Sequence, residues 1–310
     1  MRQACPCLKW NHRSSPILPA KNKIAMTNNK KNIIVLIGAG SIGQAIARRV
    51  GAGRHVLIAD LFKDHAENVA RKFDDAGFSV TATEVDIASR PSIVKLAQLA
   101  DSLGTIYGVI NAAGVSPSQA PVEAILKVDL YGTAVILEEF GKIIGNGGSG
   151  IVISSQSGHR LGPLSLEEND LLATTPTEEL LSLPLLQNIT NTLQAYQLSK
   201  RCNVLRVASE CVNWGRRGAR LNAISPGIII TPLANDELRG PRGENYRNML
   251  ANCPAKRAGT PDEVGDLAAF LMSDRAQFIT GSDFLMDGGA TASYWYGDLQ
   301  YLRRQTEKLL

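Results

Sequence analysis

The chain has 310 residues, of which 44% are hydrophobic and 20% charged, as expected of a soluble globular protein with one large or two modest domains. No apolar run approaches the roughly 20 residues of a membrane span. The net charge is +4, but residues 1–31 hold seven Lys or Arg and no acid, which leaves 4 − 7 = −3 for the remainder. This slightly acidic body gives no electrostatic basis for nucleic-acid binding.

The basic N-terminal segment, residues 1–31, lacks the hydrophobic core of a secretory signal peptide. A basic, acid-free stretch is also compatible with an organelle transit peptide, and Met26 offers an alternative start. Because no amphipathic helical pattern is evident, we expect a disordered extension.

The five cysteines have no regular spacing; they are Cys5, Cys7, Cys202, Cys211 and Cys253. The first two form only a weak metal-binding signal. We therefore expect reduced thiols in a cytoplasmic protein, with neither a disulfide nor a bound metal.

Apolar, β-branched runs alternate with helical patterns along the chain. The runs predict strands at residues 32–38, 54–60, 78–86, 105–114, 149–158, 219–227 and 282–289. Between them the sequence predicts helices at residues 41–51, 62–77, 91–104, 121–145, 189–214 and 260–273. The helix at 260–273 begins with Thr260, Pro261 and Glu263, the pattern of a capping box.

Repeated strand–helix units predict an α/β fold of the Rossmann type, a doubly wound parallel sheet of about seven strands with helices on both faces. No low-complexity linker divides residues 32–290, so we expect a single domain. A helical insertion at about residues 160–190 precedes the helix at 189–214, and residues 291–310 form a tail. Ligands of such sheets bind beyond the carboxyl ends of the strands.

The segment Gly38-Ala-Gly40-Ser-Ile-Gly43 lies between the first strand and the first helix, where free N–H groups of a helix N-terminus can bind a pyrophosphate. Asp60 ends the second strand, 17 residues after Gly43. A carboxylate there can accept both ribose hydroxyls and repels a 2′-phosphate, which favours NAD over NADP. Lys63 is the nearby cation that weighs against this preference.

Tyr196 and Lys200 lie four residues apart in a predicted helix, and therefore on one face of it. A neighbouring ammonium favours the phenolate and lowers the pKa of a tyrosine, which fits it for proton transfer. The alternative interpretation of this common spacing is two unrelated surface residues, and only the rest of the chain decides between them.

Seven motifs in the same order resemble those of the short-chain dehydrogenase/reductase family over about residues 32–290. They are "IGAGSIGQAIA", "EVDI", "INAAG", "VISSQSG", "YQLSK", "ISPGIIIT" and "FITGSDFLMDGG". The long insertion, "RLNAISPG" and "FLMS" are most similar to the branch that contains bacterial 3α-hydroxysteroid dehydrogenase/carbonyl reductase.

The resemblance implies catalytic roles for Ser155, Tyr196, Lys200 and Asp129. Tyr196 would be the general acid/base, Lys200 would lower its pKa and hold the cofactor ribose, and Ser155 would bind the substrate oxygen. Ser154 would point to the opposite face of the strand. Asp129 stands where the family usually has Asn in a proton relay, and an ionised Asp can only accept hydrogen bonds. Asp129 either takes part in the relay, pairs with Lys200 and thereby weakens its effect on the Tyr196 pKa, or only packs a helix.

The resemblance also implies a binding site for NAD. Its residues would be Gly38, Gly40, Ser41, Ile42, Gly43, Asp60, Asp86, Ile87, Asn111, Ala112, Gly114, Tyr196, Lys200, Pro226, Gly227, Ile229 and Thr231. The glycine turn is one residue shorter than is usual in the family, and Ser41 stands where the second glycine would be. A serine can still donate a hydrogen bond to a phosphate.

The insertion and the tail each have two interpretations. Within the insertion, Thr175, Pro176 and Glu178 predict a helix start, and Leu180 to Leu186 provide an apolar side. The insertion is expected near the active-site mouth, either as a lid for an apolar substrate or as a subunit interface. The aromatic tail would cover either a pocket or a neighbouring subunit.

Together these features predict an NAD(H)-dependent oxidoreductase that interconverts a secondary alcohol and a ketone, with an apolar substrate such as a hydroxysteroid or terpenoid. The alternatives are a 3-oxoacyl-(acyl-carrier-protein) reductase-like enzyme and a non-catalytic dinucleotide-binding scaffold. We expect a homodimer or homotetramer with no nucleic-acid or membrane partner.

Overall fold

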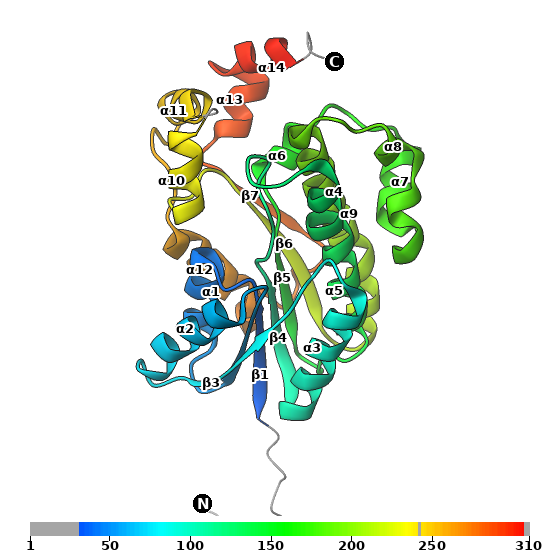
Figure 1. The fold of residues 1–310 in the computed structure, drawn as a ribbon, viewed down its shortest axis with the longest axis vertical. Helices are drawn as coiled ribbons and strands as arrows, with labels where there is room; N and C mark the ends of the chain where they lie inside the picture. Colours follow the sequence, from blue (N-terminus) through cyan, green and yellow to red (C-terminus); the bar gives the residue numbers. More distant parts are fainter. Residues whose placement is uncertain (1–30, 241–242, 307–310) are drawn as a thin grey trace, which may run out of the picture.

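The computed structural model describes residues 31–240 and 243–306, which form a seven-stranded parallel sheet flanked by helices (Figure 1). The predicted extension at residues 1–31 falls outside this range except for Lys31. The strand order is β3-β2-β1-β4-β5-β6-β7, so the chain changes direction between β1 and β4. The strands are β1 (Asn32–Ile37), β2 (His55–Asp60), β3 (Ser79–Glu84), β4 (Thr105–Asn111), β5 (Ser149–Ile153), β6 (Arg220–Pro226) and β7 (Asp283–Met286).

The helices occupy both faces of the sheet and its carboxyl end. They are α1 (Ser41–Val50), α2 (Lys63–Asp74), α3 (Arg90–Leu103), α4 (Val122–Ile125), the π-helix η1 (Leu126–Gly132), α5 (Thr133–Gly141), α6 (Gln156–His159), α7 (Leu166–Thr174), the 3₁₀ helix η2 (Thr177–Ser182), α8 (Pro184–Gln187), α9 (Thr192–Arg216), α10 (Pro232–Arg239), α11 (Gly243–Asn252), α12 (Pro261–Met272), the 3₁₀ helix η3 (Asp274–Ala276), α13 (Ala290–Tyr296) and α14 (Gln300–Thr306).

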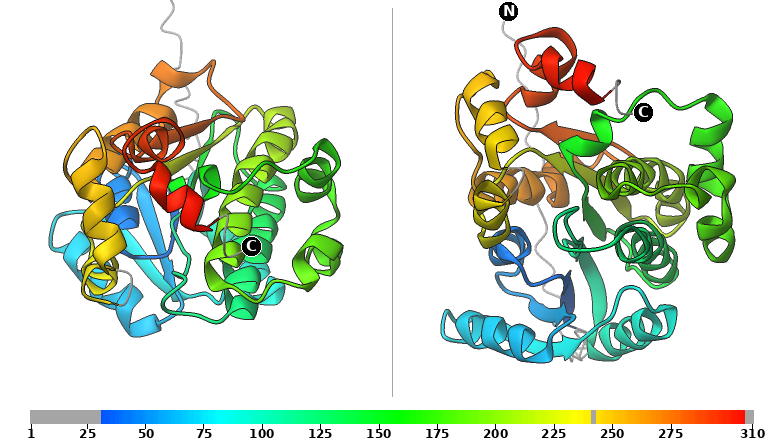
Figure 2. Two further views of the ribbon diagram at one scale, coloured as in Figure 1. Left: turned by 90° about the horizontal axis from the view of Figure 1, so that it is seen from above. Right: turned by 45° about the horizontal axis from the view of Figure 1, so that its top comes forward.

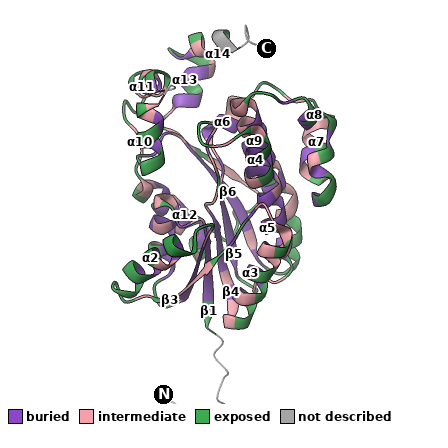
Figure 3. Cartoon of the chain, viewed as in Figure 1, coloured by how far each residue is buried: buried purple, intermediate pink, exposed green. Residues whose placement is uncertain are grey.

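Alternation along β1 divides the hydrophobic core into two layers. Ile33, Val35 and Ile37 face α3, α5 and α9, whereas Ile34 and Leu36 face α1, α2 and α12. All five side chains are at most 1% exposed, because both faces of a parallel sheet are covered by helices (Figure 3). The predicted α/β fold is confirmed.

Two predicted helix starts have different outcomes. Thr260 caps α12, and Glu263 completes the capping box as predicted. The prediction that Thr175 is the N-cap of a helix is wrong: Thr175 is the C-cap of α7, which ends at Thr174, and the following segment is the 3₁₀ helix η2. The capping box of the insertion instead starts α7, with Ser165 and Glu168.

The insertion is fixed to the outer side of α9 and η1. Leu172, Leu180 and Leu186 are buried against Leu130 and Leu198. Figures 1 and 2 show α7 and α8 on the far side of α9 from α10 and α11. None of the insertion's leucines lines the cavity described below, and its role as a lid or as a subunit interface stays a prediction.

A charged cluster attaches η2 to the body of the domain. Arg90 in α3 forms ion pairs with Glu138 at 2.7 Å and with Glu139 in α5, and also with Glu178 in η2. The Tyr131 hydroxyl donates to Glu178 at 3.0 Å. Arg90 is the main reason that the pKa of Glu138 falls to about 2. These contacts hold the insertion near α3 and α5.

The C-terminal segment covers the carboxyl end of the sheet. Tyr294 of α13 and Met249 of α11 belong to one buried cluster, against which Leu302 of α14 packs. Tyr294 and Leu302 line a cavity of their own chain. Among the residues described, no helix is both long enough and apolar enough to span a bilayer.

Candidate active site

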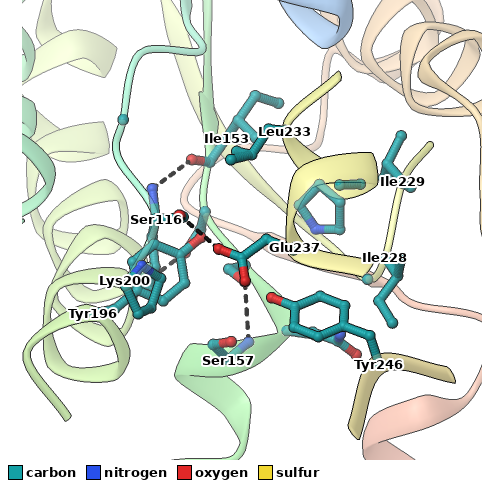
Figure 4. A pocket seen from close by; sticks show the side chains of 18 of the residues that line it. Ser116, Ile153, Ser157, Tyr196, Lys200, Ile228, Ile229, Leu233, Glu237 and Tyr246 are labelled. Carbon is teal, nitrogen blue, oxygen red and sulfur yellow. Dashed lines mark hydrogen bonds between the residues drawn. The ribbon is translucent and has the colours of Figure 1, made fainter. Parts of the chain in front are cut away.

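A cavity of about 440 Å³ opens at the carboxyl ends of β4, β5 and β6 (Figure 4). It is bounded on one side by Tyr196 and Lys200 from α9 and on the other by Leu233 and Glu237 from α10. This is the position at which a doubly wound sheet binds its ligands. It brings together side chains that are widely separated in the sequence.

The phenol and the ammonium are placed by successive turns of α9. Asn191 caps this helix, and its Oδ1 accepts from the backbone amides of Leu193 and Gln194. Lys200 is 4% exposed, and its Nζ lies 5.3 Å from the centre of the Tyr196 ring. The predicted shared face is therefore present, and it faces the cavity.

Asp129 lies beneath the lysine as its counter-ion. Its side chain is fully buried, with Oδ1 2.9 Å from Lys200 Nζ and Oδ2 accepting from the Val115 amide at 3.3 Å. Lys200 Nζ also donates to the Ile153 carbonyl oxygen at 3.5 Å. Of the predicted possibilities for Asp129, the geometry matches pairing with Lys200.

The ion pair fixes the charge of Lys200. Burial favours the neutral amine, but Asp129 and then Tyr196 outweigh it and raise the pKa of Lys200. For Asp129, burial raises the pKa, while Lys200 and the Val115 amide oppose this. Because each group is the main partner that stabilises the charge of the other, we treat them as an ammonium–carboxylate pair.

Tyr196 does not have the lowered pKa that its spacing from Lys200 predicts. Burial is the largest influence and raises the pKa of the phenol. Lys200 acts to lower this pKa, Asp129 acts to raise it, and a hydrogen bond with Ser155 lowers it by less. The net pKa is above the usual value, so the isolated chain keeps Tyr196 protonated at neutral pH.

The two serines after β5 point in different directions. Ser155 lines the cavity, and its Oγ accepts from the Ser157 amide at 3.1 Å as the cap of α6. Ser154 is buried, with its Oγ donating to the Lys200 carbonyl oxygen at 2.8 Å. Ser154 therefore joins β5 to α9, and Ser155 is the hydroxyl placed near Tyr196.

The glycine turn after β1 is tight at Gly38 and open at Gly40. Gly38 has φ +86°, and a Cβ there would lie 2.5 Å from the Ala113 nitrogen. A Cβ on Gly40 would meet no atom within 4 Å, so the space above the turn is open. Helix α1 begins here without a side-chain cap and without an acid in its first turn. Its free N–H groups fit a pyrophosphate.

Asp60 is held at the end of β2 beside this turn. Its Oδ2 accepts from the Ala39 amide at 2.9 Å, and its Oδ1 accepts from the Phe62 amide at 3.2 Å. A carboxylate has about four lone-pair positions, so it can still accept ribose hydroxyls. His65, which the sequence analysis did not single out, places Nδ1 3.3 Å from Asp60 Oδ2.

The remaining predicted cofactor residues form two groups. Those that line the cavity are Ile42, Ala112, Gly114, Tyr196, Lys200, Pro226, Gly227, Ile229 and Thr231. Those that lie outside it, toward the ends of β1 to β4, are Gly38, Gly40, Ser41, Gly43, Asp60, Asp86, Ile87 and Asn111.

Several of these residues have structural contacts as well. Asp86 is exposed after β3, where its Oδ1 accepts from the Ala88 amide at 2.9 Å. Asn111 is buried and donates to the Thr133 hydroxyl at 3.2 Å, while its Oδ1 has no partner. The Thr231 hydroxyl caps α10.

The cavity also contains polar residues that sequence reasoning missed. Glu237 is 5% exposed and accepts from the hydroxyls of Ser116 at 2.7 Å and Ser118 at 2.8 Å, as Figure 4 shows for Ser116. Arg160 and Gln156 also line the cavity. No short motif marks these residues, because α6, α10 and the loop after β4 meet only in the folded chain.

Metal ligands and disulfides do not contribute to the described site. Within residues 31–240 and 243–306, no three His, Cys, Asp or Glu side chains gather as metal ligands. Cys202, Cys211 and Cys253 are free thiols. Cys5 and Cys7 lie outside the described residues.

Family comparisons match most of the chain. The short chain dehydrogenase family matches residues 31–165, and the family described as enoyl-(acyl carrier protein) reductase matches residues 181–291. The short-chain dehydrogenase/reductase bsc3 of Alternaria brassicicola is 41% identical over 89% of this chain and 98% of its own length. The protein therefore belongs to the short-chain dehydrogenase/reductase family.

More distant proteins share the fold. D-threitol dehydrogenase of Mycolicibacterium smegmatis is 28% identical over 84% of this chain and 93% of its own length. A short-chain dehydrogenase/reductase structure from Serratia marcescens has a TM-score of 0.67 at 22% identity, covering 84% of this chain and 98% of that one. A 7α-hydroxysteroid dehydrogenase bound to NADH and 7-oxo glycochenodeoxycholic acid has a TM-score of 0.64 at 23% identity, with coverages of 83% and 93%.

Family membership establishes the general activity. The protein is an oxidoreductase for alcohol- or ketone-type substrates, and its family uses nicotinamide dinucleotides. The predicted similarity to the hydroxysteroid dehydrogenase/carbonyl reductase branch stays a prediction, because the hydroxysteroid enzyme found here is similar at the level of the fold alone.

Replacing Lys200 by Met should strongly destabilise the protein, since Asp129 would be left as a buried charge without a counter-ion. Such a loss typically costs about 3–5 kcal/mol of unfolding free energy. Urea unfolding would measure it, with Lys142→Met as the control. Lys142 forms a half-exposed ion pair with Glu138 at 2.9 Å, whose loss should cost at most about 1 kcal/mol.

The double variant Lys200→Met/Asp129→Asn should recover much of the lost stability, because the amide that replaces the carboxylate would carry no charge. If Lys200→Met unfolds at the same urea concentration as Lys142→Met, the buried pair does not have the role assigned to it.

Proposed function

We propose that the protein is an NAD(H)-dependent dehydrogenase that interconverts a secondary alcohol and a ketone, with Tyr196 as the general acid/base. The supporting observation is the arrangement of Tyr196, Ser155 and Lys200 around one cavity, next to an open glycine turn. Lys200 is held there by Asp129. A scaffold without activity would have no need for this arrangement.

In the reductive direction, the substrate carbonyl oxygen would lie between the Ser155 and Tyr196 hydroxyls. Both hydroxyls donate hydrogen bonds to this oxygen, and the two hydrogen bonds strengthen as negative charge develops on it. A bound nicotinamide supplies the hydride for reduction and accepts it in oxidation. Tyr196 transfers its proton to the oxygen, and the Lys200 ammonium stabilises the phenolate that remains.

The protonated state of Tyr196 suits it to begin carbonyl reduction. Burial raises the pKa of Tyr196, so the proton donor is present at neutral pH without any further ionisation. Alcohol oxidation needs the phenolate instead. Its rate should therefore rise with pH as Tyr196 loses its proton.

Asp60 supports NAD as the cofactor. Its carboxylate is fixed by the Ala39 and Phe62 amides and would face the 2′ position of the adenosine ribose. Two hydroxyl groups can donate to it, whereas a phosphate would be repelled. A preference for NAD also disfavours the acyl-carrier-protein reductase alternative, because we expect such an enzyme to prefer NADPH.

The cavity wall supports an apolar substrate body. Ile153, Leu193, Ile228, Leu233 and Met249 contribute to it. We propose a cyclic alcohol or ketone of the steroid or terpenoid type. On the basis of its family, we also propose a homodimer or homotetramer.

Replacing Tyr196 by Phe should reduce kcat by at least about 10²-fold, because the proton donor is lost while the ring is retained. Binding of NADH, measured by its fluorescence, should change little. Tyr246→Phe is the matched control, since this phenol lines the same cavity on α11 and should retain most of the activity. Equal turnover by Tyr196→Phe and wild type would refute the assignment.

Replacing Asp60 by Asn should reduce the preference for NAD over NADP. The ratio of the two kcat/KM values should fall at least roughly tenfold, or about 1.4 kcal/mol, because the charge that repels the 2′-phosphate is removed. Asp64→Asn, in the first turn of α2 and exposed, is the control. An unchanged ratio in Asp60→Asn would show that this carboxylate does not select the cofactor.

A further inference from the structure

A second cation, Arg160, lies in the cavity wall and has no part in the proposed proton transfer. It follows α6, five residues after Ser155, so β5 positions both side chains. Its Nη2 donates to Ser157 Oγ at 3.2 Å. Its guanidinium carbon lies 5.7 Å from the centre of the Tyr294 ring, where the aromatic face also stabilises the cation.

No carboxylate among the described residues forms an ion pair with Arg160. The charge of Asp287 favours the cationic form of Arg160, but Asp287 forms no ion pair with it. The oxygens of Asp287 instead accept from the backbone amides of Gly289 at 2.8 Å and Thr291 at 2.6 Å. The Arg160 Nε is buried without an acceptor. Burial lowers the pKa of Arg160, although nearby phenols and Asp287 favour the cation. Arg160 is only partly exposed, and a largely desolvated charge without a counter-ion is costly, so an anionic ligand would be favoured here.

Gln156 places a second side-chain donor, its Nε2, beside this guanidinium. It lies four residues before Arg160 and is 5% exposed, with its Oε1 buried and without a partner. The Gln156 Nε2 and the Arg160 Nη1 both point to the Met249 sulfur, at 3.4 and 3.6 Å. A thioether is a weak acceptor, and the unbranched Met side chain adapts easily. Two strong donors thus converge on a position that a better acceptor could take.

The other cation among the described residues that line the cavity, Lys200, is already paired. Lys200 pairs with Asp129, and Glu237 accepts from two serine hydroxyls. Among the described residues that line the cavity, Arg160 is therefore the cation that lacks a carboxylate.

We propose that Arg160 and Gln156 form an anion subsite that binds a carboxylate of the substrate. The substrate would then be an oxo acid or hydroxy acid with an apolar body. The guanidinium would donate to the carboxylate from Nε and Nη1, and the Gln156 amide would donate from Nε2. The inference rests on the proposed function, since it assigns the reacting carbonyl to Tyr196 and the carboxylate to Arg160.

Arg160 also affects Tyr196, because its charge favours the phenolate. Loss of Arg160 could then change turnover without any subsite. This effect acts on every substrate equally, whereas a carboxylate subsite distinguishes an acid from its neutral analogue. The test must therefore compare matched charged and neutral ligands, and it must include binding as well as turnover.

The binding experiment uses decanoate and decanamide, which share an apolar chain and differ in charge. Calorimetric titration of the NADH-loaded protein should show decanoate binding at least roughly tenfold more tightly. Arg160→Met should abolish this preference and leave decanamide binding unchanged, while Arg160→Lys should retain part of it. Arg201→Met is the control, because Arg201 lies on α9 outside the cavity and donates to Asn169 at 3.2 Å.

The kinetic experiment uses 5-oxodecanoate and its methyl ester as ketone substrates. Arg160→Met should raise KM for the acid at least roughly tenfold with little change for the ester. Absence of a preference for decanoate in the wild type, or its persistence in Arg160→Met, would overturn the subsite. A preference for decanoate without turnover of any ketone would instead retain the subsite and reject the proposed dehydrogenase activity.

Discussion

The candidate active site depends on the buried ion pair between Asp129 and Lys200. The π-helix η1 places Asp129 below the cavity, and such helices are frequent at functional sites. Gly114 allows the pair to form, because a Cβ at this position would lie 2.5 Å from Asp129 Oδ1 and 3.3 Å from Lys200 Nζ. A buried ammonium without this carboxylate would tend to lose its proton. The pair thus keeps Lys200 charged beneath the Tyr196 ring.

The same pair limits how strongly the lysine acts on the tyrosine. Asp129 contributes a negative charge that opposes ionisation of Tyr196, and burial opposes it further. In the proposed reaction, the protonated Tyr196 of the free chain would therefore act first as the proton donor to a carbonyl. A positive nicotinamide ring beside the phenol would favour the phenolate and fit the reverse reaction. A substrate carboxylate bound at Arg160, as proposed, would neutralise a cation that lowers the Tyr196 pKa, and would therefore favour the protonated phenol.

The sequence predicts the sheet and its ligand-binding end well, because both depend on local patterns. Buried β-branched runs mark the strands. The glycine turn follows β1, Asp60 ends β2 and Tyr196 lies within α9, and all three elements are evident in the sequence. The pKa of Tyr196 could not be predicted, since it depends on burial and on Asp129, whose position is 71 residues from Lys200. Arg160 and Glu237 were missed for a similar reason: α6, α10 and the loop after β4 come together only through tertiary packing. Thr175 was misplaced because a threonine before proline also fits the end of α7.

The central claim is that Asp129 holds Lys200 charged while keeping the Tyr196 phenol protonated. Its most direct test is a spectroscopic titration of tyrosinate absorbance without cofactor, in which the Tyr196→Phe curve is subtracted from that of the wild type. We predict that Tyr196 ionises above the usual tyrosine pKa of about 10. Ionisation of Tyr196 near neutral pH in the wild type would contradict the account.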